Sequence, residues 1–125
     1  MIAKIATVTV LVRDQDAAAA FYVEKLGFEK RDDVGATDYR WLVVAPRGGQ
    51  TQIYLARGGP GTLHEGEPIG GQTGIMFESQ DVHATYLELA GRGVRFPQVP
   101  TTLPYGIQAQ LEDPDGNVFL LQQSQ

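Results

Sequence analysis

Histidine and cysteine, two side chains often used as metal ligands, bases or nucleophiles, are rare or absent in this chain. It has no cysteine, so neither a thiolate nucleophile nor a cysteine metal ligand is available. Its two histidines are His64, in a glycine-rich stretch, and His83, in the first turn of a predicted helix, where a solvated side chain is expected. No serine stands in a Gly-x-Ser-x-Gly motif. The arrangement that remains for a metal or a general base pairs His64 with the carboxylate of Glu78 or Glu112.

Aromatic and amide side chains form a larger group, and most of them share one face of the predicted strands. Aromatic rings with a polar group, together with a few amides, are the usual lining of a site that holds a planar organic molecule. Alternatively, the same side chains fill a core, although a dry core must provide a hydrogen-bond partner for every glutamine amide. In a further alternative, Trp41 and Tyr39 lie at a subunit interface. The predicted ligand-binding residues are Thr7, Thr9, Tyr39, Trp41, Gln52, Tyr54, Met76, Tyr105, Gln108, Gln110 and Leu120.

The first half of the chain must position the N-terminal members of this group. Alternating β-branched residues predict a strand, and Asp14 is a suitable N-cap for a helix that Gly27 ends. The predicted elements are a strand over 5–12, a helix over 15–26, a short strand over 28–31, a turn over 32–35, and strands over 39–44 and 51–56.

A stretch rich in glycine and proline, from Arg57 to Gly71, follows these elements and is interpreted as a linker or an ordered lid. The pattern then restarts, with Asp81 as a second N-cap. The predicted elements are a strand over 74–78, a helix from 82 to Gly91 or Gly93, a short strand over 94–96, a proline-broken loop over 97–105, and strands over 106–112 and 118–122 joined by the turn Asp113-Pro114-Asp115-Gly116-Asn117.

The two halves repeat one order of elements at a nearly constant offset. Asp14 and Asp81 are 67 residues apart, and Gly27 and Gly93 are 66 apart. This predicts an α+β fold of tandem β-α-β-β-β modules, with helices on the convex side of a cup-shaped mixed sheet. The single domain would span residues 1–125, with one module over about 1–57, a linker over 58–71 and a second module over about 72–125.

Composition narrows the classes of partner. With 15 acidic and 10 basic residues, the net charge of −5 repels phosphate backbones, so no nucleic-acid partner is expected. The same charge weakly favours a cationic ligand. The first residues lead into a strand rather than a signal peptide, and no apolar run reaches membrane-spanning length, so we expect a cytoplasmic protein without a membrane partner.

Several short motifs, in this order, make the whole chain similar to one known group of proteins. The chain resembles the glyoxalase / bleomycin-resistance / extradiol-dioxygenase family, the vicinal oxygen chelate superfamily. This resemblance implies a cup formed by two modules, usually in a homodimer, and in catalytic members a divalent metal held by His, Glu or Gln from the first and fourth strands of each module. The motifs are Val12-Arg13-Asp14, Ala20-Phe21-Tyr22, Leu26-Gly27-Phe28, Asp81 with Gly93-Val94, and Asp113-Pro114-Asp115-Gly116-Asn117 before an apolar strand.

The family's metal positions carry unsuitable residues here. They correspond to Thr7 and Gly74 on the first strands and to Tyr54 and Leu120 on the fourth strands. Gly74 and Leu120 have no ligating group, and hydroxyls are poor ligands for Zn, Ni, Fe or Mn beside imidazole and carboxylate. We therefore expect no metal, no cofactor and no catalytic residue of the family's usual kind.

The predicted function is that of a metal-free protein that binds a small organic molecule, such as an antibiotic, in the cup of a homodimer. The alternative is a lyase, isomerase or dioxygenase of the glyoxalase type, with a nonstandard metal site or with acid–base chemistry by Glu78 or Glu112. A third interpretation is a domain whose modules serve subunit association alone.

Overall fold

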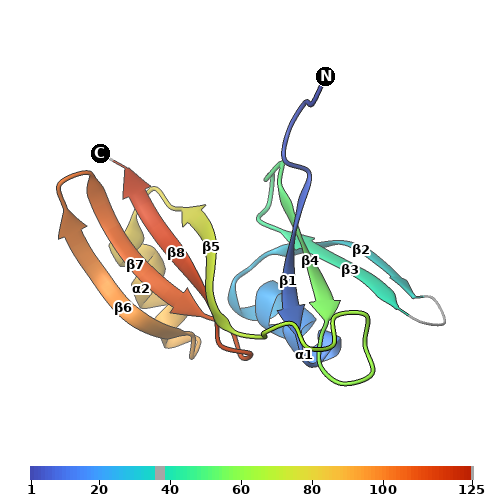
Figure 1. Ribbon diagram of the computed structural model, residues 1–125. Coiled ribbons are helices and arrows are strands. Elements are labelled where there is room, and N and C mark those ends of the chain that lie inside the picture. The colour runs from blue at the N-terminus through green and yellow to red at the C-terminus, as the bar shows by residue number, and fades with distance from the viewer. Residues whose placement is uncertain (36–38, 125) are drawn as a thin grey trace. The chain divides into compact units, whose positions relative to one another are not determined.

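The computed structural model describes residues 1–35 and 39–124, and it divides the chain into two compact units, Met1–Ile69 and Gly70–Gln125 (Figure 1). Each unit is a four-stranded mixed sheet with a helix, so the predicted α+β class is confirmed. In the described part of the chain, neither helix has the length and apolar character needed to cross a membrane.

The first unit places its strands in the order β1-β4-β3-β2. The helical segment begins as an α-helix and ends as a π-helical turn, in which Leu26 N–H donates to the Phe21 carbonyl at 3.1 Å. The elements are β1 (Thr7–Val12), α1 (Gln15–Ala20), η1 (Phe21–Lys25), β2 (Glu29–Gly35), β3 (Arg40–Ala45) and β4 (Gln52–Arg57).

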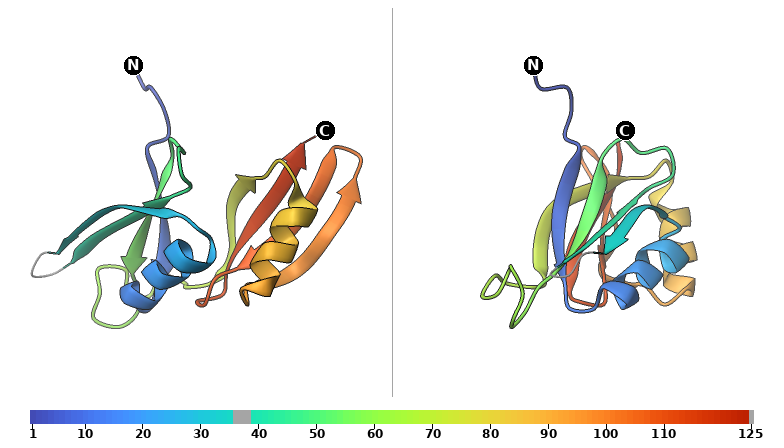
Figure 2. Two further views of the ribbon diagram at one scale, coloured as in Figure 1. Left: turned by 180° about the vertical axis from the view of Figure 1, so that it is seen from behind. Right: turned by 90° about the vertical axis from the view of Figure 1, so that its right-hand side faces the viewer.

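Alternation along β1 and β4 separates a buried side from a more open side of this sheet, although Val43 and Ala56 on the more open side are also fully buried. On β4, Ile53 and Leu55 are buried, whereas Gln52 and Tyr54 on the other face are only half-buried. The buried face lies under the helical segment (Figure 2), and the Tyr22 side chain of that segment is fully buried. Burial of apolar side chains between the helix and one sheet face therefore leaves Thr9, Gln52 and Tyr54 at least partly exposed on the other face.

The second unit repeats this arrangement with the strand order β5-β8-β7-β6. Its helix packs against one face of the sheet, where Leu111 and Phe119 are buried (Figure 2). The elements are β5 (Gly71–Glu78), α2 (Val82–Gly91), β6 (Arg95–Leu103), β7 (Gly106–Glu112) and β8 (Asn117–Ser124).

Matching caps support the predicted internal repeat. The Asp14 carboxylate accepts from Ala17 N–H at 3.1 Å, and the Asp81 carboxylate accepts from Ala84 N–H at 3.0 Å. Gly27 and Gly93 follow the two helical segments with φ of 76° and 89°, a backbone region that favours glycine. Together with the identical strand order, these caps confirm the tandem β-α-β-β-β topology.

The turn predicted over residues 32–35 is wrong, because this segment belongs to β2. Asp32, Asp33 and Val34 pair with residues of β3, after a shift of register that follows Lys30. β2 is the outer strand of its sheet, and an outer strand tolerates polar residues that a central strand excludes. Consecutive aspartates are typical of a turn, and they fit a strand only at a sheet edge. The sequence does not show which strand lies at the edge, so a turn was predicted.

The loop predicted over residues 97–105 is also wrong, because most of it forms β6. Gln98 and Thr101 pair with Gln110 and Gln108 of β7, and the register shifts before each of them. Proline lacks an N–H donor, so it is tolerated in outer strands and at such irregular positions. β6 is an outer strand, which explains how it contains both Pro97 and Pro100.

Candidate functional site

A pair of aromatic rings stands on the open face of the first sheet. The rings of Trp41 and Tyr54 have centroids 4.5 Å apart and are inclined at 35°. Both side chains are half-buried, and Tyr39, just before β3, is 53% exposed. Three of the predicted binding residues thus come from two neighbouring strands and the segment beside them.

The strand register explains this pairing. Tyr54 lies between Val43 of β3 and Thr9 of β1, its partners in the sheet. Trp41 is two residues before Val43 and therefore points to the same face. The threonine hydroxyl and the two rings consequently share one surface, with Thr9 exposed and Tyr54 half-buried.

Thr7 and Gln52 continue this open face toward the start of β1 and β4. They are partners in the sheet, and Gln52 Nε2 donates to Thr7 Oγ1 at 3.4 Å. Both are half-buried, so their polar groups border the aromatic pair on one side. The first unit therefore brings together the predicted set Thr7, Thr9, Tyr39, Trp41, Gln52 and Tyr54.

The environment of Tyr54 favours its neutral form. Burial raises the pKa of the Tyr54 phenol above its ordinary value, and the nearby Tyr39 phenol raises this pKa further by repulsion when it ionises. Tyr54 therefore keeps an O–H that can donate a hydrogen bond up to a higher pH than an ordinary tyrosine does. Since the folded protein holds this proton more tightly than the unfolded chain, stability declines as the pH rises past the tyrosine pKa.

An alkaline titration followed by Trp41 fluorescence should reveal this shift. The chain has one tryptophan, and an ionised Tyr54 beside it is expected to quench its emission. We expect a midpoint above the ordinary tyrosine pKa of about 10, and a lower midpoint in Tyr39→Phe, which cannot ionise. A midpoint at or below the ordinary value would contradict the assignment.

The second sheet also has an open face, of different character. Met76 and Leu120 are partners on β5 and β8, and Leu120 also faces Gln110 of β7. Met76 is 51% exposed, and Gln72 Nε2 donates to Gln110 Oε1 at 3.3 Å. This surface combines two apolar side chains with amides, so it can contact an organic molecule and hydrogen-bond with it.

Gln108 and Tyr105 occupy the neighbouring part of this unit. Gln108 is half-buried and lies opposite Gln122 on β8, on the face that bears Gln110. Tyr105 is 58% exposed, in the turn between β6 and β7. The second unit therefore holds Met76, Gln108, Gln110 and Leu120 on one face, with Tyr105 at the end of a hairpin.

The metal positions implied by the resemblance do not suit a metal. The register sets Thr9 beside Tyr54 and Met76 beside Leu120, with Thr7 two residues before Thr9 on the same face and Gly74 in an irregular part of β5. A thioether, an aliphatic side chain and two kinds of hydroxyl do not provide the imidazole and carboxylate ligands that such ions prefer. Across residues 1–35 and 39–124, no three His, Cys, Asp or Glu side chains gather in a group able to hold a metal ion.

His64 pairs with a carboxylate of its own loop. Its Nδ1 lies 2.7 Å from Glu67 Oε2, three residues along the chain. Glu112 Oε1 is 3.8 Å from a guanidinium nitrogen of Arg95, and His83 is exposed on α2. The structure thus gives His64 a partner that the sequence interpretation, based on Glu78 or Glu112, did not consider.

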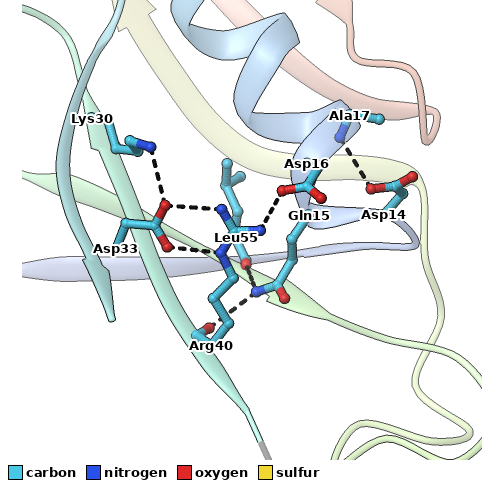
Figure 3. A network of polar contacts seen from close by, with 8 residues as sticks. All are labelled: Asp14, Gln15, Asp16, Ala17, Lys30, Asp33, Arg40 and Leu55. Carbon is cyan, nitrogen blue, oxygen red and sulfur yellow. Dashed lines mark hydrogen bonds and ion pairs between the residues drawn. The ribbon is translucent and has the colours of Figure 1, made fainter. Parts of the chain in front are cut away.

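A polar network behind the aromatic pair was missed in the sequence (Figure 3). Arg40 Nε and a second guanidinium nitrogen donate to the two carboxylate oxygens of Asp33, at 2.7 and 2.9 Å, and a third donates to Asp16 at 2.6 Å. These donors and Lys30 lower the pKa of Asp33 well below its usual range, and the two carboxylates raise that of Arg40. The sequence signal for this network was the presence of oppositely charged residues in a strand-rich segment. The sequence could not show which of them pair, because Arg40 and Asp16 are 24 residues apart.

The turn Asp113–Asn117 is held by its own polar groups. Asp113 is buried, and its Oδ1 accepts from the N–H groups of Asp115 and Asn117, each at 2.9 Å. Its Oδ2 accepts from Asn117 Nδ2 at 2.9 Å, and Asn117 Oδ1 accepts from Gly70 N–H at 3.0 Å. These carboxylate and amide groups stabilise the turn and its attachment to the chain before β5, so the turn has a structural role.

Comparison with known proteins agrees with this architecture. The sequence profile described as "Glyoxalase/Bleomycin resistance protein/Dioxygenase superfamily" matches residues 4–121. The uncharacterized protein YetH of Bacillus subtilis is 36% identical over 124 residues, which cover 98% of this chain and all of YetH.

Solved structures are similar over nearly the whole chain. A member of the glyoxalase/bleomycin resistance protein/dioxygenase superfamily from Sphaerobacter thermophilus is 38% identical with a TM-score of 0.90, covering 98% of each chain. TnmS3, an antibiotic binding protein from Streptomyces sp. CB03234, is 37% identical with a TM-score of 0.86, covering 99% of this chain and 98% of TnmS3. By its sequence, its repeated topology and these relatives, the chain belongs to the glyoxalase/bleomycin resistance protein/dioxygenase superfamily.

Proposed function

We propose that this protein binds and sequesters a planar aromatic organic molecule, such as an antibiotic, without converting it chemically. The observation that carries the proposal is the Trp41–Tyr54 pair, whose rings remain only half-buried on the open face of a sheet. An exposed aromatic cluster on a rigid sheet gives a ligand a large contact area at little cost in conformational entropy. The similarity to TnmS3, an antibiotic binding protein, supports an antibiotic as the ligand.

Polar groups around the rings would orient the ligand. The hydroxyls of Thr9 and Tyr54 stand beside the ring pair, and the raised pKa of Tyr54 keeps its phenol a donor. Taken by itself, the second unit presents the amides of Gln108 and Gln110 on the same face as its exposed Met76. A few polar groups among apolar ones are typical of sites that select a ligand by its orientation.

The proposal includes a metal-free, homodimeric protein in the cytoplasm. The residues at the family's metal positions support the first part, since Thr7, Tyr54, Gly74 and Leu120 are poor ligands or none. The family resemblance supports the dimer. Stoichiometric transition metal in purified protein would contradict the metal-free part, and a monomeric mass by analytical ultracentrifugation would contradict the dimer.

Quenching of the single tryptophan tests the binding proposal directly. Doxorubicin, proflavine and bleomycin are suitable probes, since they represent an anthraquinone, an acridine and a glycopeptide antibiotic. We expect at least one to quench Trp41 saturably and to raise the melting temperature with concentration, since a ligand that binds only the folded state stabilises it. If none of the three does either, the proposed function is wrong. Recovery of the bound probe unchanged after prolonged incubation distinguishes sequestration from turnover.

A further inference from the structure

The two strands that carry the aromatic pair are hydrogen-bonded over a short stretch. The register between β3 and β4 runs over Val43 with Tyr54 and Val44 with Ile53. Arg40 and Leu55 lie outside these two pairs. Arg40 comes just before Trp41 in the chain, and Leu55 comes just after Tyr54. At this point β3 and β4 are not paired with each other, so the backbone carbonyls of Arg40 and Leu55 are open to a hydrogen bond from a side chain.

The side chain of Gln15 provides that group. Its Nε2 donates to the Arg40 carbonyl at 3.0 Å and to the Leu55 carbonyl at 2.8 Å, the two dashed lines from Gln15 in Figure 3. Arg40 immediately precedes Trp41 in the chain, and Leu55 immediately follows Tyr54. One amide group thus bridges β3 and β4 next to both aromatic residues.

Further contacts fix Gln15 and the start of α1. Asp14 caps the helix by accepting from Ala17 N–H, which sets the position of the first helical residue. Arg40 links Asp16 of the same turn to Asp33 of β2. Arg40 and Trp41 are consecutive on β3, so their side chains point to opposite faces of the sheet. The polar contacts consequently lie behind the surface that bears the rings.

We propose that Gln15 is a positioning residue, whose side-chain amide sets the separation of β3 and β4 and thereby the stacking of Trp41 on Tyr54. This inference rests on the proposed function, because Gln15 lies outside the ligand-binding surface and is proposed to control the affinity of that surface for the ligand. An aromatic pair that must accept a flat ligand loses affinity when its rings are free to move, since binding must then order them.

The second unit shows that the bridge is specific to the aromatic site. Val82 stands at the position of Gln15 there, 67 residues on, and the strands β7 and β8 pair continuously from Gly106 with Ser124 to Glu112 with Val118. Val82 has no polar side-chain atom, so it cannot form the bridge that Gln15 forms. Gln123 instead accepts from Val82 N–H at 2.8 Å, at the start of α2.

The test uses two variants of equal side-chain length that cannot donate, Gln15→Met and Gln15→Glu. Both should keep the far-ultraviolet circular dichroism of the wild type. We expect the near-ultraviolet signal of Trp41 to weaken and its quenching by acrylamide to rise roughly twofold, as the ring pair loosens. Gln123→Met is the matched control, because it removes a glutamine contact at the other helix and should leave the Trp41 signals unchanged.

Binding of proflavine, or of whichever of the three probes binds the wild type, gives a second measurement. Its affinity should fall about fivefold to tenfold in Gln15→Met and remain unchanged in Gln123→Met. If Trp41 spectra and affinity are the same in Gln15→Met as in the wild type, the positioning role is wrong. If the spectra change but no probe binds the wild type, the proposed function fails while the positioning role stands.

Wild-type protein supplies a measurement that does not depend on the folding of a variant. In a nuclear magnetic resonance spectrum, the side-chain amide protons of Gln15 should exchange with water more slowly than those of the exposed Gln50. Equal exchange rates at the two glutamines would show that Gln15 does not hold the two carbonyls, and would overturn the inference.

Discussion

Replacing Asp113 by alanine is expected to lower the free energy of unfolding by about 3–5 kcal/mol. The substitution removes the acceptor for Asp115 N–H, Asn117 N–H and Asn117 Nδ2, and leaving a buried donor without a partner costs about 1–3 kcal/mol. In a chain of this size, such a loss corresponds to a fall in melting temperature of roughly 10–20 °C. Thermal and urea unfolding followed by circular dichroism measure it.

Asp113→Asn is the matched control for this prediction. Its side-chain oxygen can still accept from the two backbone N–H groups, but its amide nitrogen then faces the amide of Asn117. We expect an intermediate loss of stability, about half that of the alanine variant. If the alanine variant is as stable as the wild type, the carboxylate is not what holds the turn, and its role in the sequence signature would require another explanation.

Replacing Trp41 by alanine is expected to weaken binding of the aromatic probe about tenfold to hundredfold. Stacking a flat ring on an aromatic side chain contributes about 1–3 kcal/mol, and removal of Trp41 also leaves Tyr54 without its neighbour. Because the tryptophan signal is lost with the substitution, isothermal titration calorimetry is the appropriate measurement. The folded state should persist, since Trp41 is only half-buried and lies on the open face.

Two further variants make the Trp41 result specific. Leu87→Ala removes an apolar side chain that is 70% exposed on α2, and it should leave probe affinity unchanged. Tyr54→Phe keeps the ring and removes the hydroxyl, so it should lose less affinity than Tyr54→Ala. If Trp41→Ala binds the probe with the same affinity as the wild type, the ring pair is not the binding surface. This conclusion does not depend on the results for the Leu87 and Tyr54 variants.

Local patterns were sufficient to predict the topology. Period-two alternation separates Ile53 and Leu55 from Gln52 and Tyr54 on β4, and burial in the structure follows this division. The N-caps at Asp14 and Asp81 fixed the helix starts, because a capping contact spans only three residues. The placement of Trp41 and Tyr54 on one face followed from the same alternation.

The features that could not be predicted depend on contacts between distant parts of the chain. Proline is tolerated in a strand mainly at a sheet edge or a bulge, so the continuation of the predicted 94–96 strand through Pro97 and Pro100 could not be recognised before the strand order was known. Gln15 lies 25 and 40 residues from the carbonyls that it bridges. In the sequence it was an ordinary helix residue beside an N-cap, and no local pattern marks such a contact.

The division of each strand into a helix-facing and an open side bears on how this scaffold can change over evolution. Residues such as Val10, Ile53 and Leu55 bury their side chains and hold the sheet to the helix, whereas Thr9 and Tyr54 alternate with them on the open side. Substitutions away from a packed core usually change stability by only about 0.5 kcal/mol or less. New specificities can therefore arise by exchanging open-side residues while the fold is conserved, so close relatives of equal stability can differ widely in what they bind.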